Sequence, residues 1–346
     1  MKLSKIFRWL TAGGVCLLLV ITGCAPAGRE PTKPQAKIET QMPEAATVDT
    51  VDLTLKFAPQ DSTKYKATTE IEMSVNFEGS FPADVISRNG RNSNKVEMLF
   101  TQTIQSIDDK GYAAAKITIE GLKYLSIYKN NPVIDFDSSR QEDRSNPLNK
   151  LVGQSYTIEI TPDGQITKVV DANQARTAVG GDATANKTAL NLLDTDVIMK
   201  RHEISALPGT YNAQLHTGDN WSSIQTFSFP IVGSKAYERV YTLKEIKTQD
   251  NHKTAIVDMN AIPSSEVEEQ SSQEQVTSPL SKMFDSTGPY TGRLELDLTT
   301  GKIEKYFEEL RSEWIAVDPD AKQNKDEEPA VVKMGAVRSH SLEKVN

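Results

Sequence analysis

From Val51 onward, apolar and polar side chains alternate with a period of two. One clear apolar series is Ile71, Met73, Val75 and Phe77. Such alternation gives an antiparallel strand one buried and one wet face. Turn sequences, for example Pro162-Asp163-Gly164, separate the alternating runs, as hairpins require. The sequence therefore predicts a mainly β fold with a minor helical segment, built as a large curved antiparallel sheet or an incomplete barrel.

Two departures from this period refine the prediction. The apolar positions move from odd to even numbers at Gly121, which indicates a β-bulge. Between about 183 and 203 apolar residues recur at intervals of three and four, so one or two helices are expected there, with a break at Asp194 and Thr195. Residues 331–345 alternate weakly and are expected either to pair as a last strand with 303–317 or to form a tail.

The β-rich domain is predicted to span residues 51–317. Its two halves, 51–171 and 218–317, both follow the order strand, hairpin, excursion, hairpin, and a helical segment, 172–217, joins them. This order indicates an internal duplication, although two unrelated runs of hairpins would give the same pattern. Residues 264–279 are rich in Ser, Glu and Gln and are expected to form a mobile loop. A charged stretch begins at 318 and belongs to the terminal segment 318–346.

The first 23 residues have the features of a lipoprotein signal peptide. Lys2, Lys5 and Arg8 precede an apolar run that is too short to span a bilayer as a helix. Residues 21–24 have the order of a lipobox, so cleavage before Cys24 and a diacylglycerol on its thiol are expected. The alternative is an uncleaved anchor helix. Residues 24–50, with four prolines, are predicted to be a flexible tether.

Lipidation would place the domain in the cell envelope, with the membrane as a partner through Cys24. Ala25 is not the Asp that commonly retains lipoproteins on an inner membrane, so the periplasmic face of the outer membrane is expected in a two-membrane cell, and otherwise the outer face of the plasma membrane. Loss of the signal peptide leaves 36 basic against 47 acidic groups and changes the formal charge from −8 to −11. This acidity argues against nucleic acid as a partner.

Catalytic and metal sites are not indicated by the sequence, and no cofactor is expected. The four histidines are not spaced as metal ligands, and serine-nucleophile and phosphate-loop motifs are absent. The acidic run Asp135–Ser139 could be a calcium loop, but without a glycine for the bend it fits a turn capped by Asp side chains better. Trp221 is interpreted as a core residue in preference to an aromatic residue of a binding site.

Several motifs together resemble an uncharacterised family of exported bacterial proteins and lipoproteins, a domain of unknown function. They are Asn146-Pro147-Leu148, residues 151–156, Pro162–Ile166, Leu207-Pro208, Gly218–Trp221 and Gly292–Gly301, in the order typical of that family. The resemblance covers roughly residues 53–314. It implies an exported β-rich domain, and it implies no activity and no functional residues.

A curved sheet closed by helices can enclose an apolar cavity, so the first functional hypothesis is a non-enzymatic carrier of an apolar or lipid-like ligand. The residues expected to line the cavity are Phe100, Ile104, Ile117, Ile119, Tyr241, Leu243, Val257 and Met259. The second hypothesis is an interaction or scaffold lipoprotein with a filled core and an envelope protein as partner. The third is a hydrolase with an unidentified site.

Overall fold

The computed structural model describes residues 50–79, 81, 83–209, 214–229, 233–249, 252–264, 285–317 and 330–345. Residues 48–346 form one compact unit. Its strands are β1 (Ser62–Glu78), β2 (Gly90–Ile107), β3 (Ala113–Tyr128), β4 (Asn131–Asp137), β5 (Ser155–Ile160), β6 (Ile166–Val170), β7 (Asn220–Phe229), β8 (Gly233–Gln249), β9 (His252–Ser264), β10 (Asp285–Thr287), β11 (Tyr290–Asp297), β12 (Lys302–Val317) and β13 (Val331–Lys344). The helices are α1 (Ala83–Ile86), α2 (Ala172–Thr177), α3 (Ala183–Leu192) and α4 (Thr195–His202), with 3₁₀ turns η1 (Glu142–Ser145) and η2 (Pro147–Leu151).

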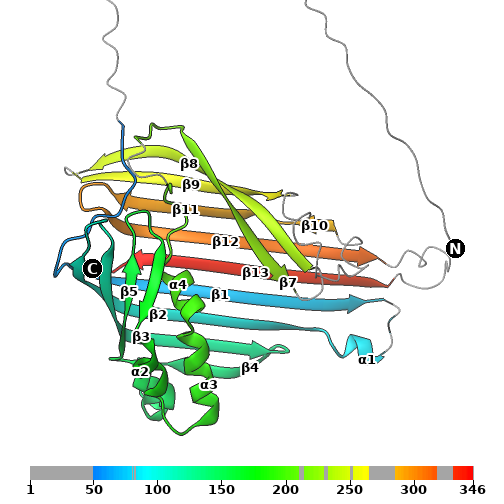
Figure 1. The fold of residues 1–346 in the computed structure, drawn as a ribbon. Coiled ribbons are helices and arrows are strands. Elements are labelled where there is room, and N and C mark those ends of the chain that lie inside the picture. The colour runs from blue at the N-terminus through cyan, green and yellow to red at the C-terminus, as the bar shows by residue number, and fades with distance from the viewer. Residues whose placement is uncertain are drawn as a thin grey trace, which may run out of the picture. The chain divides into compact units, whose positions relative to one another are not determined.

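All thirteen strands belong to one antiparallel sheet, which confirms the predicted fold class. The order is β6-β5-β3-β2-β1-β13-β12-β11-β9-β8-β7, with β4 paired to β3 and β10 to β12. The path ends at β6 and β7, so the sheet formed by the described strands is open. The last strand, β13, lies in the middle of the sheet between β1 and β12 (Figure 1). The strands of the two predicted halves progress in the same direction along the sheet, as an internal duplication would require. The duplication itself stays a prediction.

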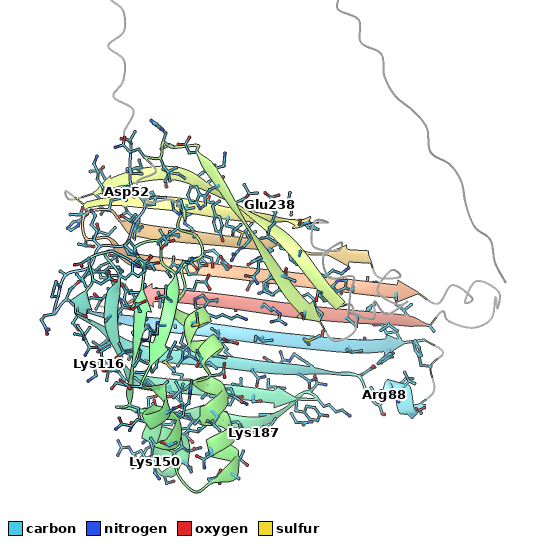
Figure 2. The ribbon with its side chains drawn as sticks, in the orientation of Figure 1. Asp52, Arg88, Lys116, Lys150, Lys187 and Glu238 are labelled. Carbon is cyan, nitrogen blue, oxygen red and sulfur yellow. The ribbon has the colours of Figure 1, made fainter. Side chains whose placement is uncertain are left out.

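The sheet has an inner face, defined here as the face that α2, α3 and α4 cover at one end (Figure 1). The ring of His202 in α4 lies 4.8 Å from that of Phe100 in β2 and fixes the helical layer to this face. At the other edge β7 pairs only with β8, but it curls across the inner face so that Phe229 reaches Trp314 of β12 at 4.8 Å. Figure 2 shows charged side chains such as Lys150 on η2 and Lys187 on α3.

Local features predicted from the periodicity are present. A register shift opposite Gly121 is the expected bulge, and the buried positions change there from Ile119 to Leu122. The helical region divides between α3 and α4 at Leu193 and Asp194, where the Asp194 carboxylate caps α4 by accepting from the N–H of Asp196. Residues 331–344 do pair with β12, and also with β1. The joining segment predicted to be helical over 172–217 also contains α2, which precedes the one or two helices expected around 183–203.

The predicted turn at Asp135–Ser139 is confirmed only in its second part. Asp135 and Asp137 lie in β4, a strand that the sequence did not suggest, and the turn follows them. Asp137 accepts from the N–H and hydroxyl of Ser139, and Arg140 forms an ion pair with Asp135 at 2.9 Å. Within the described residues no group of acidic, His or Cys side chains could hold a metal ion.

Several predicted segments lie outside the described residues. They are the signal peptide 1–23, Cys24, the tether up to residue 49, nearly all of the loop 264–279 and the charged stretch 318–329. Among the helices that the structure describes, none has the length and apolar character needed to cross a membrane.

Candidate functional site

The inner face is a filled core at its covered end. All eight residues predicted to line a cavity lie on this face, and none is more than 3% exposed. They pack against each other across neighbouring strands, as in the pairs Phe100–Ile119, Tyr241–Met259 and Leu243–Val257. All eight belong to the hydrophobic core, and Ile104 also lines a small cavity.

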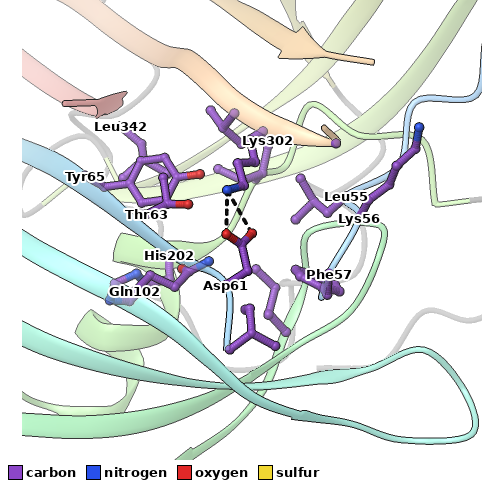
Figure 3. Close-up of a pocket in the computed structure, with 15 residues that line it drawn as sticks. Leu55, Lys56, Phe57, Asp61, Thr63, Tyr65, Gln102, His202, Lys302 and Leu342 are labelled. Carbon is purple, nitrogen blue, oxygen red and sulfur yellow. Dashed lines mark hydrogen bonds and ion pairs between the residues drawn. The ribbon is translucent and has the colours of Figure 1, made fainter. Parts of the chain in front are cut away.

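This cavity lies where the extended segment before β1 crosses the end of the sheet (Figure 3). Its volume is about 30 Å³, which is room for one or two water molecules. Asp61 and Lys302 close one side through an ion pair of 2.8 Å, and the side chains of Tyr65 and His202 approach it from the other side. A space of this size cannot hold an acyl chain, because pockets for such ligands measure several hundred Å³.

A buried ion pair marks the middle of the inner face. Arg239 of β8 donates from Nη1 to both carboxylate oxygens of Glu308 in β12, at 3.3 and 3.2 Å. Their side chains are only 7% and 12% exposed. Three tyrosine hydroxyls also donate to Glu308, from Tyr241 at 3.2 Å, Tyr290 at 2.8 Å and Tyr306 at 2.6 Å. We call these five residues the polar cluster.

The charge states of the polar cluster follow from this geometry. Burial, assisted by the nearby carboxylate of Glu308, raises the pKa of all three tyrosines, so their hydroxyls stay protonated. Burial lowers the pKa of Arg239, but the attraction of Glu308 and of the three tyrosine oxygens together outweighs it, and the net shift is upward. Glu308 therefore accepts from a permanent cation and three neutral donors, which leaves its oxygens saturated.

Two histidines lie at the inner face, and one of them, His340, adjoins the polar cluster. His340 of β13 lies opposite Glu308 in the sheet, and both of its ring nitrogens are buried without a hydrogen-bond partner among the described residues. Burial lowers the pKa of His340 to about 4. His202 has its Nε2 2.8 Å from the hydroxyl of Tyr156, and burial lowers its pKa well below the ordinary value. Both imidazoles are therefore neutral at neutral pH.

Other buried donors on this face are also unpaired within the described part of the chain. They are Nε of Arg239 and the indole N–H groups of Trp221 and Trp314. Buried polar groups in proteins nearly always have a partner, and water or a ligand supplies it where the protein does not. Trp221 was expected to be a core residue, and its ring stacks on Tyr241 at 5.9 Å while its nitrogen remains free of a protein acceptor.

Beyond the polar cluster the inner face becomes apolar again and is no longer fully covered. In β1, Ile71 is 46% exposed, and Met73, Val75 and Phe77 are partly exposed. Their β13 partners, from Arg338 to Val332, continue the same face. We call Ile71, Met73, Val75 and Phe77, together with Val332, the open strip. It is the part of the apolar inner face that remains accessible.

The polar cluster was not predicted from the sequence, although a signal for it was present. Glu308 falls on the same alternating positions as Tyr306, Leu310 and Trp314, which are buried. Arg239 likewise occupies the apolar phase of its strand, between Tyr237 and Tyr241. A charged residue in the buried phase of a strand requires a partner, and this requirement could have singled out both residues. It could not have paired them, since 69 residues separate them.

Residues 110–303 match the model of a family of unknown function, DUF6263. The chain belongs to this family. The expected resemblance to an uncharacterised family is thereby confirmed. A search of the curated proteins gives no match.

Two solved structures show distant likeness to the chain. A structure of lipovitellin, concerned with its lipid–protein interactions, is 12% identical at a TM-score of 0.36, over 84% of this chain and 26% of lipovitellin. The chain thus spans about a quarter of the length of that protein. DynF from the dynemicin biosynthesis pathway of Micromonospora chersina is 7% identical at a TM-score of 0.17, over 87% of this chain and 88% of DynF. Likenesses this weak carry no argument about function.

Proposed function

We propose that this protein is a lipid-anchored envelope lipoprotein that binds an apolar, lipid-like ligand on the open strip. The observation that carries the proposal is the partial exposure of apolar side chains on a face that is buried elsewhere. Ile71 is 46% exposed on the same face of β1 as Tyr65 and Ala67, which are 5% and 2% exposed. Continuous exposed apolar surface of this kind typically binds a ligand or a partner.

The packing of the inner face supports the open strip as the place where the ligand lies. The covered end of the inner face is filled by core side chains, and its cavity of about 30 Å³ is too small for an acyl chain. The hypothesis of a ligand enclosed at that end is therefore replaced by one of a ligand lying along the open strip. The anchor proposal rests on the lipobox that ends at Cys24. Two acyl chains at that residue would hold the domain stably at the membrane.

The test uses the full chain, purified from membranes in mild detergent and examined by native mass spectrometry. We expect a mass that includes a diacylglycerol and a second, non-covalent lipid that gentle activation removes. Ile71→Glu places a charge on the open strip and should abolish the non-covalent lipid. Because Ile71 is already half exposed, this variant should still fold.

The matched control is Ile315→Glu. Ile315 is 40% exposed and lies on β12, two strands from β1, but it points to the outer face, since its neighbours Trp314 and Ala316 are buried on the inner one. This variant should keep the lipid. If the native protein carries no lipid, or if both variants lose it equally, the ligand-binding proposal is wrong.

A second candidate function is that of an interaction lipoprotein whose open strip contacts an envelope protein, since a filled core needs no enclosed ligand. The eight core residues and the small cavity are as compatible with this function as with ligand binding. Chemical crosslinking in intact cells through a photoreactive residue at position 71 separates the two. A protein adduct supports the interaction lipoprotein, and a lipid adduct supports the carrier.

A further inference from the structure

Arg338 is a cation at the boundary between the polar cluster and the open strip. It lies on the inner face of β13, opposite Ile71 of β1 and Leu310 of β12. Its Nη2 donates to the carbonyl of Ser228 in β7 at 3.1 Å, and its guanidinium carbon lies 5.4 Å from the ring centres of both Phe227 and Phe229. The two rings and the carbonyl fix the guanidinium in place.

This cation has no carboxylate partner among the described residues. None of their ion pairs within 4.0 Å includes Arg338. Glu308 lies on the same face of β12, two residues from Leu310, the residue that pairs with Arg338. Its oxygens already accept from Arg239 and three tyrosines. A guanidinium has five N–H donors, and only one of those on Arg338 has an acceptor in the described chain. Burial opposes its charge, but arginine stays protonated in proteins.

Unpaired buried polar groups lie on the same face of the sheet as Arg338. Nε of Arg239 and the indole N–H of Trp314 are buried without acceptors within the described residues, and Arg239 and Trp314 are 6% and 1% exposed. His340, two residues along the same face, has both ring nitrogens unpaired. A guanidinium with free N–H groups and no carboxylate partner among the described residues favours an anionic acceptor such as a carboxylate or phosphate oxygen.

The open strip starts at this point. Ile71 pairs with Arg338, and the strip continues along β1 to Phe77, which pairs with Val332. Six residues of strand span about 20 Å, enough for an extended long-chain acyl group. The strip therefore offers an apolar track with a cation at one end and no cation within it, an arrangement that matches an amphiphile with one charged end.

We propose that Arg338 forms an anion-binding subsite, and that the ligand of the open strip is a long-chain fatty acid whose carboxylate lies at Arg338 and whose chain runs toward Phe77. This inference rests on the proposed function and names its ligand class.

The experiment compares hexadecanoic acid with hexadecanol, which have equal chain lengths, for binding to the full-length protein by displacement of a fluorescent fatty-acid probe. The native protein should bind the acid about ten- to a hundredfold more tightly than the alcohol, because a charge-assisted hydrogen bond contributes on that scale. Arg338→Gln should remove this preference by weakening the acid alone. Arg311→Gln is the control, because Arg311 is exposed, lies on the outer face of β12 and pairs with Glu309.

Arg338→Lys covers the case in which the glutamine variant does not fold. It keeps the charge without the planar stacking on two phenylalanine rings, so it should retain part of the preference for the acid. Equal affinities for acid and alcohol in the native protein would refute the anion subsite and leave ligand binding intact. So would an Arg338→Gln variant that weakens both ligands alike. Failure of the native protein to bind either compound would refute both this inference and the proposed function.

Discussion

Replacing Glu308 with Gln should destabilise the protein strongly, although the two side chains have nearly the same shape. The carboxylate is the sole anionic partner of Arg239 within the described residues and the acceptor for three tyrosine hydroxyls. The variant leaves a guanidinium that is 93% buried without its counter-charge. Breaking one half of a buried ion pair typically costs about 3 to 5 kcal/mol. Such a loss is a large part of the roughly 5 to 15 kcal/mol that stabilises an ordinary domain.

Urea unfolding monitored by tryptophan fluorescence measures this loss, since Trp314 lies on the same strand as Glu308 and is 1% exposed. The matched control is Glu309→Gln. Glu309 is the next residue, lies on the outer face and pairs with the exposed Arg311, so its loss should cost less than about 1 kcal/mol.

A double variant tests the cause. Arg239→Met combined with Glu308→Leu removes both charges, and it should recover much of the stability that Glu308→Gln loses, because paired burial is costly and apolar replacement is often neutral. A Glu308→Gln variant within about 1 kcal/mol of Glu309→Gln would refute the reasoning, since it would mean that the pair is not desolvated.

Two further predictions concern the same face. His340 has a pKa of about 4 in the fold against 6.5 when unfolded, so its contribution is present above about pH 6.5 and is lost as the pH falls toward 4, by about 3 kcal/mol in total. His340→Phe should flatten this dependence in urea midpoints measured between pH 7 and 4.5, with Glu308 and Arg201 as the charged neighbours that act on it; an unchanged slope contradicts the prediction. Gly292→Ala should lower the thermal midpoint, because an added Cβ would lie 2.7 Å from the carbonyl oxygen of Phe307 and 3.1 Å from Cγ of Glu308, and overpacking of this kind costs about 1 to 3 kcal/mol. A midpoint equal to that of the native protein would show that the strand yields without cost.

The sequence alone determined most of the local structure. Alternation with period two located the strands, the Pro162–Gly164 turn joined β5 to β6, and Gly121 located the bulge in β3. These features depend on residues close together in the chain, where backbone geometry and side-chain phase decide the outcome. The same phase placed all eight proposed lining residues on one buried face, but it did not determine whether that face enclosed a cavity.

Only the tertiary structure determined which strands meet and what remains exposed. β13 was expected beside β12, but the structure also pairs it with β1, and this places Arg338 opposite Ile71. The curl of β7 brings Phe227 and Phe229 over Arg338, 109 to 111 positions away in the chain. Such contacts are chosen by the packing of the whole sheet, because each strand has one apolar face that several partners could cover. The sequence shows that Glu308 and Arg239 need partners, and the curvature of the sheet decides that they are partners of each other.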